Sequence, residues 1–134
     1  MTSSQDRRAK ARRVSFDELE FRPRFEYGEQ AEIAVVTGAE DGTPLGTGFA
    51  RFAEAAIPWT LRYDEVLLVI EGSVTVETGG QELVLGPRDC AWLPKGSALV
   101  YRSPDALLFY AIHPSNWAGG DPDRAADPGA AEPA

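Results

Sequence analysis

The sequence predicts an all-β domain built as a sandwich or a barrel. Short runs rich in valine, isoleucine, phenylalanine, tyrosine and tryptophan recur along the chain, and strand surfaces favour these side chains. Glycine and proline turn signals separate the runs. Patterns typical of helices are almost absent, and many short strands at close spacing indicate a sandwich or a barrel.

The predicted elements follow one another at short intervals. Ser15 to Glu18 has the pattern of a capping box and predicts one helical turn. The Gly79-Gly80 pair, between two runs of alternating polarity, predicts a hairpin. Strands are expected over Glu32–Thr37, Thr47–Ala53, Glu65–Ile70, Ser73–Glu77, Glu82–Leu85, Cys90–Leu93, Ala98–Arg102 and Leu107–Ile112.

The chain of 134 residues is expected to hold one folded domain between two tails. Residues 1–13 are polar and basic, which predicts a disordered tail. Residues 118–134 are rich in glycine, proline and alanine and have no periodic apolar face, which predicts a second disordered tail. The folded domain is therefore expected over residues 14–117.

Charge and composition narrow the expected partners and location. The net charge of −8 argues against nucleic acid or a membrane as a partner. Residues 7–13 carry five positive charges, which suit either a partner-binding arm or a solvated tail. We favour the tail because no aromatic residue interleaves the charges to stack on bases. With neither a signal peptide nor an apolar stretch of about 20 residues, we expect the protein in the cytoplasm.

The single cysteine, Cys90, agrees with a reducing compartment, and its apolar neighbours predict a buried, inert thiol.

One predicted strand is apolar on both faces. Val66 to Ile70 are five consecutive apolar residues, so one face of this strand would line the barrel. The other face would pack on a second sheet or on a second subunit. The run from Leu107 to Ile112 has the same character. A homodimer is therefore expected.

The stretch from Ala53 to Gly72 resembles the first motif of the cupin barrels. Glu65 and Gly72 stand where that motif has its glutamate and its closing glycine. Trp59 and Leu61 stand where it has its two histidines, and Ala53 where it has its opening glycine.

The stretch from Arg88 to Ser103 resembles the second cupin motif. Pro94 and Gly96 match its Pro-x-Gly core, and Leu99 stands in place of its histidine. The resemblance implies a cupin-type double-stranded β-helix, also called a jelly-roll barrel.

The three replaced histidines change the expected chemistry. A first-row metal in this fold needs imidazole nitrogens together with a carboxylate. The indole nitrogen of Trp59 keeps its proton, and Leu61 and Leu99 offer no donor atom. Glu65 cannot hold a metal ion alone, so we expect neither a metal nor another cofactor.

Longer strings point to one cupin family. Residues 58–65 read Pro-Trp-Thr-Leu-Arg-Tyr-Asp-Glu, and further segments agree over Val69–Gly72, Leu93–Ser97, Phe109–Tyr110 and Pro114–Trp117. These strings resemble the EutQ family of ethanolamine utilization proteins, which are cupins that also lack the three histidines. The resemblance implies a role in ethanolamine or acetate metabolism, and an acetate kinase activity is attributed to some members.

Strand alternation suggests which side chains share a pocket. If Glu65 points into the barrel, so do Leu67, Val69 and Glu71, and Tyr101 points in with Leu99. By the same alternation, Glu54 shares a face with Phe52, and Tyr110 with Leu108. Aromatic walls and two carboxylates are typical of a small-molecule site, here made of Glu54, Trp59, Tyr63, Glu65, Tyr101 and Tyr110.

The acid or base candidates are Glu65, Glu54, Tyr63 and His113. Carboxylates in an apolar pocket have raised pKa values, and histidine titrates near neutral pH. Alternatively, Glu54 and Glu65 pair with Arg51, Arg62 or backbone amides near the rim, Tyr63 only packs, and His113 is a bonded structural residue. We interpret Trp59, Tyr101 and Tyr110 as substrate-binding walls, while Lys95 would either grip an anion or be solvated in its turn.

Three functions compete at this point. The first is a metal-independent, small-molecule-binding cupin resembling EutQ. The second is a metal-free isomerase, cyclase or lyase that uses Glu65 as acid or base. The third is a non-catalytic protein that binds a metabolite or belongs to a microcompartment, with the basic arm as an address.

Overall fold

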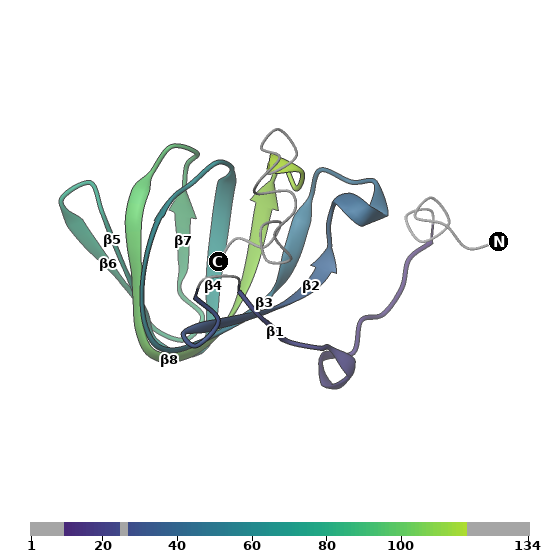
Figure 1. Ribbon diagram of the computed structural model, residues 1–134, viewed down its shortest axis with the longest axis horizontal. Coiled ribbons are helices and arrows are strands. Elements are labelled where there is room, and N and C mark those ends of the chain that lie inside the picture. The colour runs from purple at the N-terminus through teal and green to yellow at the C-terminus, as the bar shows by residue number, and fades with distance from the viewer. Residues whose placement is uncertain (1–9, 25–26, 118–134) are drawn as a thin grey trace.

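A computed structural model describes residues 10–24 and 27–117, in which eight antiparallel strands curve into a barrel (Figure 1). Two short 3-10 helices in the described part are η1 (Phe16–Glu18) and η3 (Ala39–Asp41). The strands are β1 (Arg22–Pro23), β2 (Ala31–Thr37), β3 (Gly46–Thr60), β4 (Asp64–Gly72), β5 (Val74–Thr78), β6 (Gln81–Leu85), β7 (Cys90–Leu93) and β8 (Ala98–His113). The all-β barrel expected from the sequence is confirmed.

The strands join in the order β1-β2-β3-β8-β4-β7, and the β5-β6 hairpin attaches to β8. The second half of β8 pairs with β4, from Ala106 to His113, whereas its first half pairs with β5, from Leu99 to Arg102. Strand β3 accompanies β8 along almost its whole length. The long strands β3 and β8 therefore pass through both halves of the barrel and hold them together.

Both long strands bend at one shared point. The pairing steps from Ala53↔Asp105 to Ala55↔Ser103, which leaves Glu54 and Pro104 without a pairing register at the bend. Glu54 has a positive φ of 45° there, an uncommon conformation for a residue other than glycine. The alternation of the side chains changes phase, because Ala53 and Glu54 are both exposed.

This bend corrects two sequence predictions. The strand expected to stop at Ala53 continues to Thr60, and the two strands expected over 98–102 and 107–112 are one strand. Pro104 and its neighbours look like a loop in the sequence, but pairing resumes on both sides of them. Because strand pairing is a long-range contact, the sequence pattern alone could not show that the pairing continues.

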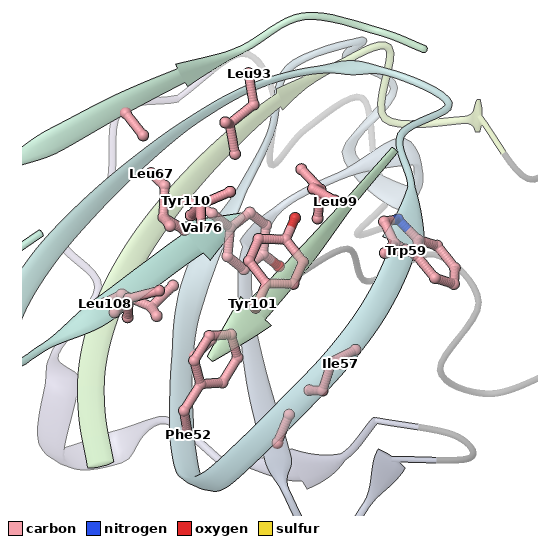
Figure 2. Close-up of a cluster of buried hydrophobic side chains, with 14 of the residues drawn as sticks. Phe52, Ile57, Trp59, Leu67, Val76, Leu93, Leu99, Tyr101, Leu108 and Tyr110 are labelled. Carbon is pink, nitrogen blue, oxygen red and sulfur yellow. The ribbon is translucent and has the colours of Figure 1, made fainter. Parts of the chain in front are cut away.

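The core fills the inside of the barrel. Leu67 and Val69 are fully buried, as alternation from Glu65 predicts, but Glu71 is exposed because the register of β4 against β8 shifts between Val69 and Glu71. Figure 2 shows the ring of Tyr101 in the middle of the cluster, with Leu99 nearby and Trp59 on β3.

The segment before β2 lies against the outside of the barrel. The Phe16 ring lies 5.2 Å from the Phe49 ring, and the Arg51 guanidinium lies 4.6 Å from the centre of the Phe21 ring. Arg12 donates a hydrogen bond to the carbonyl of Val36 at 3.1 Å. Residues 1–9 and 118–134 of the expected tails lie outside the described residues.

Two local predictions are settled by the side chains. The helical turn predicted after Ser15 is present as η1, but the Ser15 side chain makes no capping hydrogen bond. Cys90, expected to be buried, is exposed. Its strand β7 is an edge strand, and Cys90 alternates with the buried Ala91, so its side chain faces outward.

No helix within residues 10–24 and 27–117 is long and apolar enough to cross a membrane.

The turn after β4 requires a glycine at position 72. Gly72 has a φ of +79°, and a Cβ atom there would lie 2.1 Å from the carbonyl oxygen of Asp105. Gly79 has a φ of +59°, but no atom lies within 4 Å of its would-be Cβ. We expect Gly72→Ala to lower the free energy of unfolding by about 2 kcal/mol or more, and Gly79→Ala by about 1 kcal/mol. Urea unfolding measures both, and equal losses would contradict this account.

Candidate functional site

Glu65 is a carboxylate buried inside the barrel. It lies near the start of β4, where its backbone pairs with Leu93 of β7 and Ile112 of β8. Its side chain has no exposed surface. The Tyr101 hydroxyl donates a hydrogen bond to Oε1 of Glu65 at 2.7 Å, while Oε2 is buried and has no hydrogen-bond partner among the described residues. One oxygen of this carboxylate is therefore fixed and the other is available.

Burial makes Glu65 a weak acid. Desolvation raises its pKa from 4.5 to about 7, although the Tyr101 hydrogen bond and the charge of Arg24 both oppose the rise. Burial and the neighbouring Glu65 also raise the pKa of Tyr101 well above its usual value, so this hydroxyl stays protonated. Near neutral pH, Glu65 can therefore gain or lose a proton while Tyr101 remains a donor.

Aromatic side chains form the wall next to this carboxylate. The Trp59 Nε1–H donates a hydrogen bond to the Tyr63 hydroxyl at 2.9 Å, and Tyr63 is fully buried. The Trp117 ring packs edge-on against Trp59, with 5.9 Å between the ring centres, and lies 5.3 Å from Tyr63. Trp59, Tyr63, Glu65 and Tyr101 of the predicted pocket thus come together, and Trp117 joins them.

Arg24 is the residue that sequence reasoning missed. It follows β1 and has no exposed surface. Its guanidinium carbon lies 4.3 Å from the centre of the Trp59 ring, a distance typical of a cation–π contact. Burial lowers its pKa, and nearby Tyr63, Tyr101 and Glu65 oppose that effect. The only sequence signal is an arginine in an extended segment between aromatic residues, which is weak.

The side chains in the positions of the cupin histidines do not fit a metal ion. Trp59, Leu61 and Leu99 are all buried, and none offers a lone pair for coordination. The described residues contain no group of three histidine, cysteine or acidic side chains that could hold a metal. The atoms here that could contact a metal ion are therefore the carboxylate oxygens of Glu65 and the phenol oxygens of Tyr63 and Tyr101.

Tyr110 is buried in the same core and also lines a cavity of about 590 Å³. The cavity has exposed residues such as Arg22 and Glu40 at its rim. Six of its lining residues have buried side chains, namely Arg24, Ile33, Asp41, Tyr110, Ile112 and Ser115. Arg24 therefore lies between the cavity and the environment of Glu65.

Three predicted site residues are not part of the buried cluster. The change of phase at the bend puts Glu54 on the exposed side, which corrects its assignment to the face of Phe52. His113 is exposed at the end of β8. Lys95 is also exposed, and its backbone N–H donates to Oδ1 of Asp64 at 2.9 Å. Within the described residues Glu65 does not hydrogen-bond to Arg51 or Arg62 either, since Tyr101 donates to Oε1 and Oε2 has no hydrogen-bond partner.

The raised pKa of Glu65 predicts a pH dependence of stability. Between pH 4.5 and about 7 the folded protein holds a proton that the unfolded chain has lost, so stability falls as the pH rises through this window. In Glu65→Gln this loss of stability should disappear. The difference in free energy of unfolding between the parent and Glu65→Gln should therefore change by about 2 kcal/mol between about pH 5.5 and about pH 8.

Urea unfolding at both pH values measures this difference. Glu71→Gln is the matched control, because Glu71 is an exposed carboxylate of the same strand. An identical pH dependence in Glu65→Gln and Glu71→Gln would show that the buried carboxyl does not titrate in this range.

Comparison with known proteins agrees with this architecture. The family model of the ethanolamine utilisation protein EutQ matches residues 10–119. The acetate kinase EutQ of Escherichia coli K12 is 37% identical over 84 residues, which cover 62% of this chain and 36% of that protein. This chain spans between 34% and 51% of the length of the curated relatives it matches.

Solved structures share the fold. The crystal structure of a putative ethanolamine utilization protein from Salmonella typhimurium superposes with a TM-score of 0.70 at 24% identity, covering 78% of this chain and 86% of that one. An RmlC-like cupin from Shewanella frigidimarina superposes with a TM-score of 0.64 at 16% identity, covering 78% and 92%. These matches confirm the resemblance to cupins and to EutQ seen in the sequence motifs. The chain therefore belongs to the EutQ family of ethanolamine utilisation proteins.

Proposed function

We propose that this protein is a metal-independent cupin that binds a small molecule beside Glu65 and exchanges a proton with it. The observation that carries the proposal is Oε2 of Glu65, a buried oxygen with no hydrogen-bond partner among the described residues. A buried polar atom without a partner is costly, so a ligand that supplies the missing hydrogen bond gains free energy from it.

The protonation of Glu65 suits it to acid or base work. Because its pKa is about 7, both the carboxyl and the carboxylate are populated near neutral pH. The Tyr101 hydroxyl holds Oε1, which directs proton transfer to Oε2. These features favour a metal-free isomerase, cyclase or lyase among the enzyme classes, with Tyr101 and Tyr63 as neutral hydrogen-bonding groups.

The cavity of about 590 Å³ offers the route to this carboxyl. Ile112 lines the cavity and is the backbone neighbour of Glu65 across β4 and β8. Since Glu65 has no exposed surface, a ligand reaches it only when the side chain of Arg24 or Ile112 moves aside. The site then excludes water once the side chain returns.

The curated relatives carry the name acetate kinase, so acetate and ATP are the first compounds to test. Arg24 is a buried cation of the kind that binds a carboxylate or a phosphoryl group. Transfer of the terminal phosphoryl group of magnesium-bound ATP to an acetate oxygen, with ADP as the leaving group, is therefore part of this proposal. A coupled assay with acetate, ATP and magnesium tests it, and the absence of turnover in folded protein would remove it.

Ligand binding is tested by thermal unfolding in excess EDTA with a panel of acetate, ATP, amino alcohols, sugar acids and amino acids. We expect at least one compound to raise the melting temperature of the parent and of Glu71→Gln by a few degrees, because a ligand that binds only the folded state stabilises it. Glu65→Gln should lose most of that shift. If no compound shifts the melting temperature, the non-catalytic, partner-binding function is supported instead. A shift that requires added metal would rule out metal-independent binding.

We propose in addition that two copies of the chain associate through the outer face of β4 and β7. Val66 and Trp92, which lie opposite each other in register, are 43% and 60% exposed, and Ile70 is 36% exposed. The neighbouring part of the same sheet is covered, since the Phe16 ring packs on Phe49 and the Phe49 ring lies 5.1 Å from Phe109. Large exposed apolar patches mark interaction sites, and a self-complementary patch suits a two-fold dimer.

Light scattering coupled to size exclusion tests this association. Trp92→Glu should reduce the mass from that of two chains to that of one, because a charge in the centre of an apolar contact is costly. Val84→Glu is the control, since Val84 is 70% exposed on β6 and outside this face. A parent protein that already has the mass of one chain would overturn the proposal.

A further inference from the structure

We propose that the guanidinium of Arg24 replaces the metal ion of the cupin fold as the cation that balances Glu65. The segment before β2 therefore contributes a functional residue to the site. This inference rests on the proposed function only in taking Glu65 as the centre of the site. It goes beyond that function by assigning the charge compensation to one positioning residue, which lies outside both cupin motifs.

Arg24 lies against the side chain that stands at the first histidine position of the cupin motif. Trp59 stands at the position of the first histidine of the cupin motif, and its ring faces the Arg24 guanidinium at 4.3 Å. A side chain that cannot ligate a metal thus holds a cation by its aromatic face instead. Leu61 and Leu99, at the other two histidine positions, are buried and contribute no metal-ligating atom.

The buried Arg24 and Glu65 carry opposite charges that stabilise each other. Arg24 and Glu65 have no exposed surface, so each loses hydration on folding and each favours the charged form of the other. The other titratable groups around the pair are phenols: Tyr27 after β1, Tyr63 before β4 and Tyr101 on β8. Among the titratable groups that act on Glu65, Arg24 is therefore the source of positive charge.

Backbone hydrogen bonds hold Arg24 in this place at the end of β1. The Arg24 backbone N–H donates to the carbonyl of Ala31 at 2.9 Å, and its carbonyl accepts a hydrogen bond from the N–H of Tyr27 at 2.8 Å. These bonds fix Arg24 at the end of β1, which pairs with β2 at only two positions. Outside the barrel, Phe16, Phe21 and Arg51 pack together and hold the preceding segment in place.

A guanidinium and a metal ion differ in what they supply. A metal ion can bind and activate water or substrate at an open coordination position, whereas arginine offers fixed positive charge and N–H donors. The role left to Arg24 is to hold down the pKa of Glu65 against the effect of burial and so keep the carboxylate populated. Arg24 is in this sense a positioning residue that acts through Glu65.

The test compares two substitutions of similar length, Arg24→Lys and Arg24→Met, of which the first keeps the charge. The readout is the pH titration of the Glu65 side-chain carboxyl carbon by NMR, identified by its loss in Glu65→Gln. We expect the Glu65 pKa to rise by about one pH unit or more in Arg24→Met and to stay near the parent value in Arg24→Lys. Arg22→Ala, which removes an exposed arginine from the same segment, is the matched control and should leave the titration unchanged.

Equal Glu65 titrations in Arg24→Met and Arg24→Lys would overturn the proposal. If Arg24→Met does not fold, Arg24→Lys decides the matter. A folded Arg24→Lys whose Glu65 titrates near the parent value supports the proposal, whereas an Arg24→Lys that also fails to fold, or whose Glu65 titration departs clearly from the parent, overturns it. A failure of the proposed function is distinguishable from this outcome. In that case no compound raises the melting temperature in excess EDTA, while the titration of Glu65 in the Arg24 variants still follows the expectation.

Discussion

The buried carboxyl group of Glu65 imposes a constraint on everything around it. A carboxylate without solvent must take up a proton, find a cation or accept hydrogen bonds. Here the Tyr101 hydroxyl satisfies Oε1 and the charge of Arg24 acts on the group as a whole, yet burial still raises the pKa to about 7. The balance leaves both protonation states of Glu65 populated near neutral pH, which is the condition under which a carboxyl group serves as either acid or base.

The side chains in the histidine positions of the cupin motifs turn this constraint into a particular kind of site. Trp59 cannot ligate a metal, but its indole N–H binds the Tyr63 hydroxyl and its ring faces Arg24. One residue thereby orients a phenol and holds a cation. Trp59, Leu61 and Leu99 are all buried, so aromatic and apolar packing stands in the three histidine positions of the motifs.

The two long strands explain how residues far apart in the sequence reach one another. Strand β8 carries Tyr101 in the half that pairs with β5, and it borders β4, which carries Glu65, in its other half. Strand β3 brings Trp59 alongside the first half of β8, where Trp59 pairs with Leu99. Arg24 arrives from the short β1 at the opposite edge of the same sheet. The curvature of the barrel, which is visible in Figure 1, closes these strands around a common interior.

The amino-acid sequence by itself determined the strand content, the inward direction of Glu65 and Tyr101, the absence of the three histidines and the family. These features depend on short-range alternation and on residue identity, which a sequence displays directly. Only the tertiary structure decided that Arg24 belongs to the site, because a charged residue reaches a buried carboxylate through long-range packing that no local pattern encodes. It also decided that Glu54 lies outside, since a bend shared by β3 and β8 changes the phase of the alternation at that residue. The exposure of Cys90 was also decided by the tertiary structure, because β7 is an edge strand whose outer face has no covering layer within the described chain.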